Sequence, residues 1–141
     1  MKYIHYGHKT FDLNQFQKVK NQDCIPKPSG GLWASREDAA YGWREWSEET
    51  DLKVNRDEYF VFELKDNAKV LTIKSLEQLE ELPQVKPPLS LPFWVILDYE
   101  KLADEYDAIE VLISEDSRLY KALYTWDCDS IVIINPDVIQ I

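Results

Sequence analysis

The chain has 141 residues, of which 45% are hydrophobic and 13% aromatic, enough for one domain with a sizeable core. Sixteen basic and twenty-six acidic residues give a formal net charge of −10. This charge opposes binding to a phosphate backbone, so direct nucleic-acid binding is not expected. A small anion is still allowed, because local main-chain N–H donors can outweigh a distant net charge.

Cysteine usage and hydropathy point to a cytoplasmic protein. Cys24 and Cys128 are far apart and have no metal-ligand spacing, so neither a disulfide framework nor a zinc site is expected. The N-terminus lacks a signal-peptide apolar region, and no apolar run approaches the ~20 residues that span a bilayer. No membrane partner is therefore expected.

The first half of the chain predicts a strand, a break and a helix. Residues 2–7 are aromatic and β-favouring and predict a strand, and an irregular helical turn follows. The prolines and glycines of 26–31 are expected to break regular structure before a brief strand at 32–34. Ser35 and the acidic residue three positions later resemble a capping box, so the best helix is expected from there to about Thr50.

Two strands and two short helices are predicted next. The strands at 59–64 and 69–73 are separated by four residues, which favours a hairpin between them. Ser75 and Asp98 are each expected to cap a short helix. The proline-rich segment 83–92 between these helices predicts a surface loop.

The C-terminal part alternates strands with one short helix. Strands are predicted at 108–113 and 130–134, a helix at 116–124, and an edge strand at 138–141. Strands outnumber long helices and do not alternate strictly with them. The sequence therefore predicts a single α+β domain over residues 1–141, with a split, mostly antiparallel sheet and short flanking helices.

The segment 27–35 is the most informative about function, because two glycines lie beside a tryptophan and a hydroxyl. Glycine lets a ligand approach the main chain, and an indole offers a broad stacking face, which suits a nucleotide or a sugar. A Pro/Gly turn that leads into a core strand explains the segment equally well. Ser35 is interpreted as a helix cap first and a ligand contact second, and Lys27 as the nearest positive group for a phosphate.

Three short stretches form a pattern when they are taken together. His5 is followed by Gly7 in the first strand, residues 31–35 read Gly-Leu-Trp-Ala-Ser and precede Tyr41, and Asp129 opens the strongest strand. In this order they resemble the ADP-ribosyltransferase superfamily, in the branch of the poly(ADP-ribose) polymerases and the RNA 2′-phosphotransferases. The chain departs from that pattern twice, with Trp in place of the first aromatic tyrosine and Asp129 in place of the catalytic glutamate.

The resemblance implies NAD as the substrate and a role for each matching residue. The His5 ring and the main chain at Gly7 would hold a ribose, and Trp33 and Tyr41 would sandwich the nicotinamide. Asp129 would stabilise the oxocarbenium-like charge as the nicotinamide bond breaks. The implied catalytic residues are thus Asp129 and His5, without a metal, and the implied NAD-binding residues are His5, Gly7, Gly31, Trp33, Ser35 and Tyr41.

The aspartate leaves several functions open. Its carboxylate is one methylene shorter than that of glutamate, and a displacement of about 1 Å can cost ~10²-fold in rate. Transfer of a single ADP-ribose to a protein acceptor, NAD hydrolysis and NAD binding without turnover are all compatible with it. A catalytically silent binding or inhibitory protein on the same scaffold is one alternative. A carbohydrate-active or sugar-binding module is another, because tryptophan, tyrosine and carboxylates also suit pyranose rings.

Two further acidic residues are candidates for chemistry. Asp127 lies two positions before Asp129, so the two carboxylates would face one side of a strand as an acid–base pair, with solvated turn residues as the alternative. Glu110 lies between two apolar strand residues and points away from them. It is interpreted as a surface-facing residue of a half-buried strand.

Overall fold

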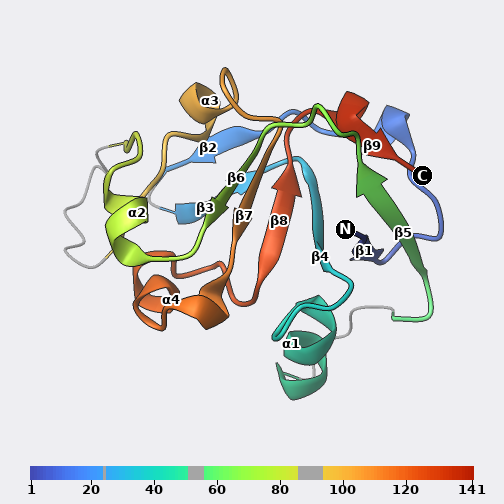
Figure 1. Cartoon of the computed structure of the whole chain (residues 1–141), viewed down its shortest axis with the longest axis horizontal. Coiled ribbons are helices and arrows are strands. Elements are labelled where there is room, and N and C mark those ends of the chain that lie inside the picture. The colour runs from blue at the N-terminus through green and yellow to red at the C-terminus, as the bar shows by residue number, and fades with distance from the viewer. Residues whose placement is uncertain (24, 51–55, 86–93) are drawn as a thin grey trace.

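The computed structural model describes residues 1–23, 25–50, 56–85 and 94–141 (Figure 1). Its strands are β1 (Tyr3–Tyr6), β2 (Lys20–Gln22), β3 (Ile25–Ser29), β4 (Leu32–Arg36), β5 (Tyr59–Leu64), β6 (Val70–Ile73), β7 (Ala108–Val111), β8 (Ser130–Ile133) and β9 (Ile139–Gln140). Seven of them form one curled sheet in the order β6-β7-β8-β4-β1-β5-β9, and β2 pairs with β3. Only the β6–β7 pair is parallel among these described pairs. The expected α+β class with a mostly antiparallel sheet is confirmed.

Short helices flank the sheet: α1 (Trp43–Thr50), α2 (Leu76–Glu80), α3 (Tyr99–Leu102) and α4 (Arg118–Ala122), with 3₁₀ turns at Leu13–Gln15, Ile113–Glu115 and Pro136–Val138. The predicted caps of two helices are confirmed. The Ser75 hydroxyl accepts from the N–H of Gln78 in α2, and the Asp98 carboxylate accepts from the N–H of Lys101 in α3. In the described ranges, no helix has the length and apolar character needed to cross a membrane.

The prediction that 26–31 breaks regular structure is wrong in its first half. Pro26 and Pro28 lie within β3, which forms a two-stranded ribbon with β2. A strand with only one partner can accept proline at positions whose N–H is not needed by the ladder. The glycines do turn the chain, with φ of +78° at Gly30 and +74° at Gly31. A Cβ on Gly31 would lie 2.4 Å from a methyl group of Val132, so glycine lets β4 begin directly against β8.

The predicted helix start at Ser35 is also wrong, because Ser35 belongs to β4 and α1 begins only at Trp43. Ser35 still caps this helix, from the strand: its hydroxyl oxygen accepts from the Trp43 N–H at 2.9 Å. Gly42 is packed tightly here, since an added Cβ would lie 3.0 Å from the Ser35 side chain. Its N–H donates to Glu45 at 3.0 Å, as in a capping box.

The predicted hairpin between 59–64 and 69–73 does not form. Strand β5 lies between β1 and β9, whereas β6 pairs with β7. Long-range aromatic contacts outweigh the short connection: Phe62 stacks on Tyr3 with ring centroids 5.6 Å apart, and Phe60 packs against His5 at 5.0 Å. The predicted loop at 83–92 falls largely on residues 86–93, which lie outside the described residues. Cys24 also lies outside them.

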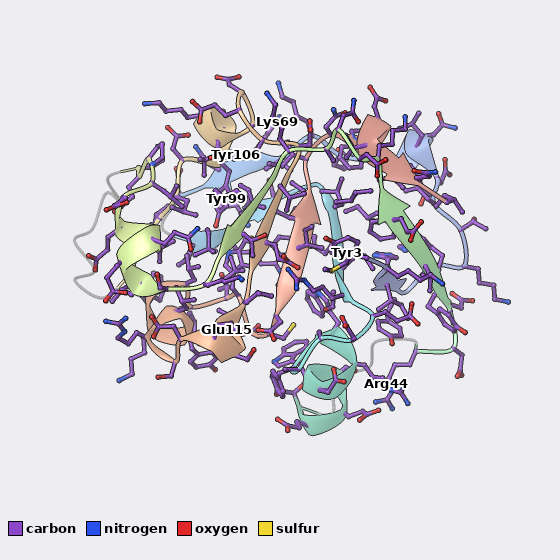
Figure 2. The ribbon with its side chains drawn as sticks, viewed as in Figure 1. Tyr3, Arg44, Lys69, Tyr99, Tyr106 and Glu115 are labelled. Atoms are coloured by element: carbon purple, nitrogen blue, oxygen red, sulfur yellow. The ribbon has the colours of Figure 1, made fainter. Side chains whose placement is uncertain are left out.

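Both faces of the central sheet are buried. One face packs against α2, α3 and α4 around Tyr99 and Trp126, and the other forms a second cluster that contains Tyr3 and Phe62. Figure 2 labels Tyr99 and Tyr3, one from each cluster. The Tyr99 hydroxyl donates to the carbonyl of Pro26 and accepts from the Trp126 indole N–H at 3.0 Å, which ties α3 to β3.

The second buried face overturns the interpretation of Glu110. Its side chain does point opposite to its apolar neighbours, but it is only 1% exposed. It accepts two hydrogen bonds from the Arg36 guanidinium, at 2.7 and 2.8 Å, and one from the Thr72 hydroxyl at 3.1 Å. Glu110 therefore forms a structural ion pair with Arg36. Strand alternation alone predicts that this face of the sheet meets solvent, but other segments of the chain cover it.

Candidate functional site

The three stretches that carry the resemblance lie on three neighbouring strands, β1, β4 and β8. Ile4 pairs with Ser35 across β1 and β4, and Ala34 pairs with Ile131 across β4 and β8. Segments from the beginning, middle and end of the chain are thus brought side by side. Alternation along each strand then decides on which face each side chain lies.

His5 lies on the face of Phe60, opposite the side chain of Trp33. Its Nδ1–H donates to the Trp33 carbonyl at 2.6 Å, which leaves Nε2 of the neutral ring to accept from His8 Nδ1–H at 2.9 Å. Burial lowers the pKa of His5. His5 and Gly31 line a small pocket of about 220 Å³ together with Phe60.

Gly7 turns the chain after β1, with φ +110° and its N–H donating to the Glu58 carbonyl at 2.8 Å. It is not among the residues that line the pocket beside His5. Its predicted contact with a ribose has no geometric counterpart in that pocket.

Trp33 lies on the other face and forms what we call the indole site, together with Lys27 and Trp43. The Lys27 ammonium lies 4.3 Å from the ring centroid of Trp33 and 5.1 Å from that of Trp43. The Trp33 N–H donates to the Gly30 carbonyl at 3.1 Å, whereas the buried Trp43 N–H has no partner in the part of the chain that the structure describes. Two indoles therefore hold one cation beside a vacant hydrogen-bond donor.

Asp127 lines a cleft between α1 and α4 and lies near enough to Lys27 for their charges to interact. This cleft has a volume of about 520 Å³, and Asp127 lines it with Tyr41, Trp46 and Tyr120. Burial raises the pKa of the Asp127 carboxyl, and the nearby Lys27 charge opposes the shift. Burial lowers the pKa of Lys27, and the Asp127 charge opposes that shift in turn. Both residues are thus partly desolvated, and their opposite charges attract each other.

Asp129 has a different environment from Asp127. It is 3% exposed, and its carboxylate accepts from Ser114 twice, from the N–H at 2.8 Å and from the hydroxyl at 2.6 Å. Its main chain is also held, because its N–H donates to the Tyr41 carbonyl and its carbonyl accepts from the Ser35 hydroxyl. Both carboxylate oxygens are thus engaged within the protein, while Asp127 faces the cleft. Between them, burial raises the pKa of the Cys128 thiol to about 12, which leaves it unreactive near neutral pH.

Tyr41 lies close to Asp129, whose N–H donates to its carbonyl, but the two rings recorded beside the Lys27 ammonium are those of Trp33 and Trp43. The Tyr41 hydroxyl donates to Glu49 at 2.5 Å, and this hydrogen bond raises the pKa of Tyr41 to about 12. Trp43 is the aromatic residue beside Lys27 and was missed, because the spacing of the motif pointed to the tyrosine two positions earlier. No local signal placed Lys27 there, since it arrives from the separate β2–β3 ribbon.

A larger cavity of about 640 Å³ adjoins Trp43 between β1, β5 and α1. Its lining includes Arg36, Arg44 and Arg56, the first paired with Glu110 and the other two with Glu48. In the described ranges, no three His, Cys, Asp or Glu side chains gather closely enough to hold a metal ion. The arrangement therefore offers an aromatic cation site, a half-buried carboxylate and an adjoining cavity with arginines.

The chain was compared with protein-family models, with curated proteins and with solved structures, and none of these comparisons finds a match. The resemblance to the ADP-ribosyltransferases therefore depends on the motif residues alone and stays a prediction.

Proposed function

We propose that the protein binds NAD through its cationic nicotinamide ring and acts on the bond between that ring and the ribose, as an ADP-ribosyltransferase or NAD hydrolase does. The observation that carries the proposal is the Lys27 ammonium over the rings of Trp33 and Trp43. A site that holds a cation on two indoles suits a pyridinium, which is flat, positively charged and able to stack.

The surroundings of the indole site suit the rest of the dinucleotide. The buried N–H of Trp43, which has no partner among the residues that the structure describes, can donate to the carboxamide oxygen of nicotinamide when the ligand enters. The adjoining cavity of about 640 Å³ is of the size that small-molecule ligands occupy. Arg44 and Arg56 are exposed there, and their surface pairing with Glu48 is weak enough to exchange for a diphosphate. In this arrangement His5 supports the main chain of Trp33.

The chemistry assigns different roles to the indoles and to the carboxylate. When the glycosidic bond breaks, its electron pair goes to the ring, which leaves as neutral nicotinamide, and positive charge develops at the ribose carbon. Asp127 faces the cleft and can stabilise that charge. Water or an acceptor hydroxyl then attacks the carbon and gives its proton to Asp127, whose raised pKa suits this step. The neutral product loses its attraction to the indoles and is released.

Calorimetric titration with NAD and NADH tests the binding step. NADH carries a neutral ring, so NAD is expected to bind about 5- to 30-fold more tightly, the ratio for one or two cation–π contacts. Trp43→Leu is expected to reduce this preference to about 5-fold or less, because only the Trp33 ring remains. Trp94→Phe is the matched control, because Trp94 stacks on Tyr124 and takes no part in the indole site. Absence of NAD binding at millimolar concentration refutes the proposal.

Chromatographic measurement of nicotinamide release tests the chemical step. Asp127→Asn removes one electrostatic attraction to the pyridinium, so it is expected to bind NAD more weakly but measurably, and to lose nicotinamide release at saturating NAD by about 10²-fold or more. Equal release by the wild-type protein and this variant would remove Asp127 from the mechanism.

A second candidate function, NAD binding without turnover, is favoured by the engagement of both Asp129 carboxylate oxygens with Ser114. It predicts that NAD binds with the preference described above while no nicotinamide is released, whichever acceptor is supplied. Nicotinamide release above the uncatalysed rate rules it out.

A further inference from the structure

We infer that Lys27 is an internal competitor for the indole site, so that its ammonium must leave before an external cation can stack on Trp33 and Trp43. The inference rests on the proposed function where it names NAD as the natural ligand. That Lys27 occupies the indole site does not depend on the proposed function. The ammonium already makes the two aromatic contacts that such a ligand would need.

The main chain around Lys27 is fixed, so the side chain is the part that can move. The Lys27 carbonyl accepts from the Gln22 side-chain amide at 2.9 Å. The preceding carbonyl, that of Pro26, accepts from the buried Tyr99 hydroxyl, and Pro28 on the other side is buried. The four-carbon stem of lysine can change rotamer without moving this ribbon, and solvation of the freed ammonium compensates for the lost contacts.

Displacement of Lys27 makes the site selective for charge. Once the ammonium has left, the two indoles and the Asp127 carboxylate have no cation beside them. A ligand with a neutral ring does not replace this positive charge. An organic cation restores both the aromatic and the electrostatic interactions. The ligand class is therefore a flat, positively charged heterocycle, with N-alkylated nicotinamide as the simplest example.

The opposite role for Lys27, a contact to a ligand phosphate, makes the contrary prediction. An attractive contact would be lost on removal of the side chain, and binding of a phosphorylated ligand would weaken. A competitor, when removed, strengthens binding of any cationic ligand, with or without a phosphate.

The experiment titrates 1-methylnicotinamide and NAD into four proteins and follows tryptophan fluorescence. The proteins are the wild type, Lys27→Ala, which empties the site, Lys27→Arg, which keeps a cation there, and Lys20→Ala. The last is a control with the same change of charge at an exposed position of strand β2 in the same ribbon. Lys27→Ala is expected to bind 1-methylnicotinamide about 5- to 30-fold more tightly than the wild type, whereas Lys27→Arg and Lys20→Ala show no gain.

The two ligands separate the inference from the proposed function. A gain with 1-methylnicotinamide supports the inference even if NAD binds none of the proteins, which would refute only the proposed function. NAD binding to the wild type that weakens in Lys27→Ala refutes the inference and leaves the proposed function standing. Unchanged or weaker 1-methylnicotinamide binding by Lys27→Ala also refutes the inference.

Discussion

Replacement of Asp129 by alanine tests whether the Asp129 carboxylate stabilises the fold. The side chain accepts two hydrogen bonds from Ser114, and bonds to a charged acceptor contribute about 1.5–3 kcal/mol each. Ser114 is exposed, so water can satisfy its donors in the variant, and the expected loss of unfolding free energy is about 2–4 kcal/mol. Ser114→Ala removes only the hydroxyl and is expected to cost about 1–2 kcal/mol. Urea unfolding at neutral pH measures both losses.

Asp129→Asn provides the functional comparison. The amide keeps an acceptor for the Ser114 N–H and offers an N–H to the Ser114 hydroxyl oxygen, so it preserves the anchor at a cost of about 1 kcal/mol. If Asp129 is structural, this variant binds and turns over NAD as the wild type does. The reasoning is refuted if Asp129→Ala costs less than about 1 kcal/mol, or if Asp129→Asn is fully stable but releases no nicotinamide where the wild type does.

The remaining predictions concern the core and the pH dependence of stability. Arg36→Met leaves Glu110 buried without its cation and is expected to lower the free energy of unfolding by about 2–4 kcal/mol. Adding Glu110→Leu should recover most of that loss, as measured by urea unfolding. Additive losses from the two substitutions would contradict the coupling. Tyr99→Phe leaves the indole N–H of Trp126 without its hydroxyl partner and is expected to lower stability by about 1–2 kcal/mol in thermal unfolding, and an unchanged Tm would contradict it. Because burial lowers the pKa of His5 from its ordinary value of 6.5, the unfolded chain binds a proton first as pH falls, so stability should be complete above pH 6.5 and decline from there down to the folded pKa. His5→Gln should flatten this decline, and an unaltered pH profile would assign it to another group.

Local signals were sufficient where the residues themselves favour one conformation. The strands at 130–133 and 59–64 are rich in β-branched or aromatic residues, and both were predicted within a residue of their observed ends. The caps Ser75 and Asp98 were also predictable, because the side chain, the backbone donors it satisfies and the helix are adjacent in sequence. These features need no knowledge of the partner elements.

The errors arose where a distant segment decides the outcome. The four-residue connection after β5 permits a hairpin, but Phe60 and Phe62 find better partners on β1, which is more than fifty residues away in the sequence. Strand alternation correctly predicted that Glu110 points away from its neighbours. It could not predict that this face is covered as well, which depends on side chains such as Val138.

The candidate site combines both situations. The order of the motifs predicts that the strands of His5, Trp33 and Asp129 belong to one architecture, and these strands are indeed neighbours in the sheet. A motif of three to five residues locates a strand, but the face that each side chain occupies depends on register and on the segments that cover it. His5 and Trp33 consequently meet through a backbone carbonyl instead of a shared ligand surface. The cation between the indoles comes from β3, whose two prolines argued against any strand, so the feature with the clearest chemistry was the one that linear spacing could not reveal.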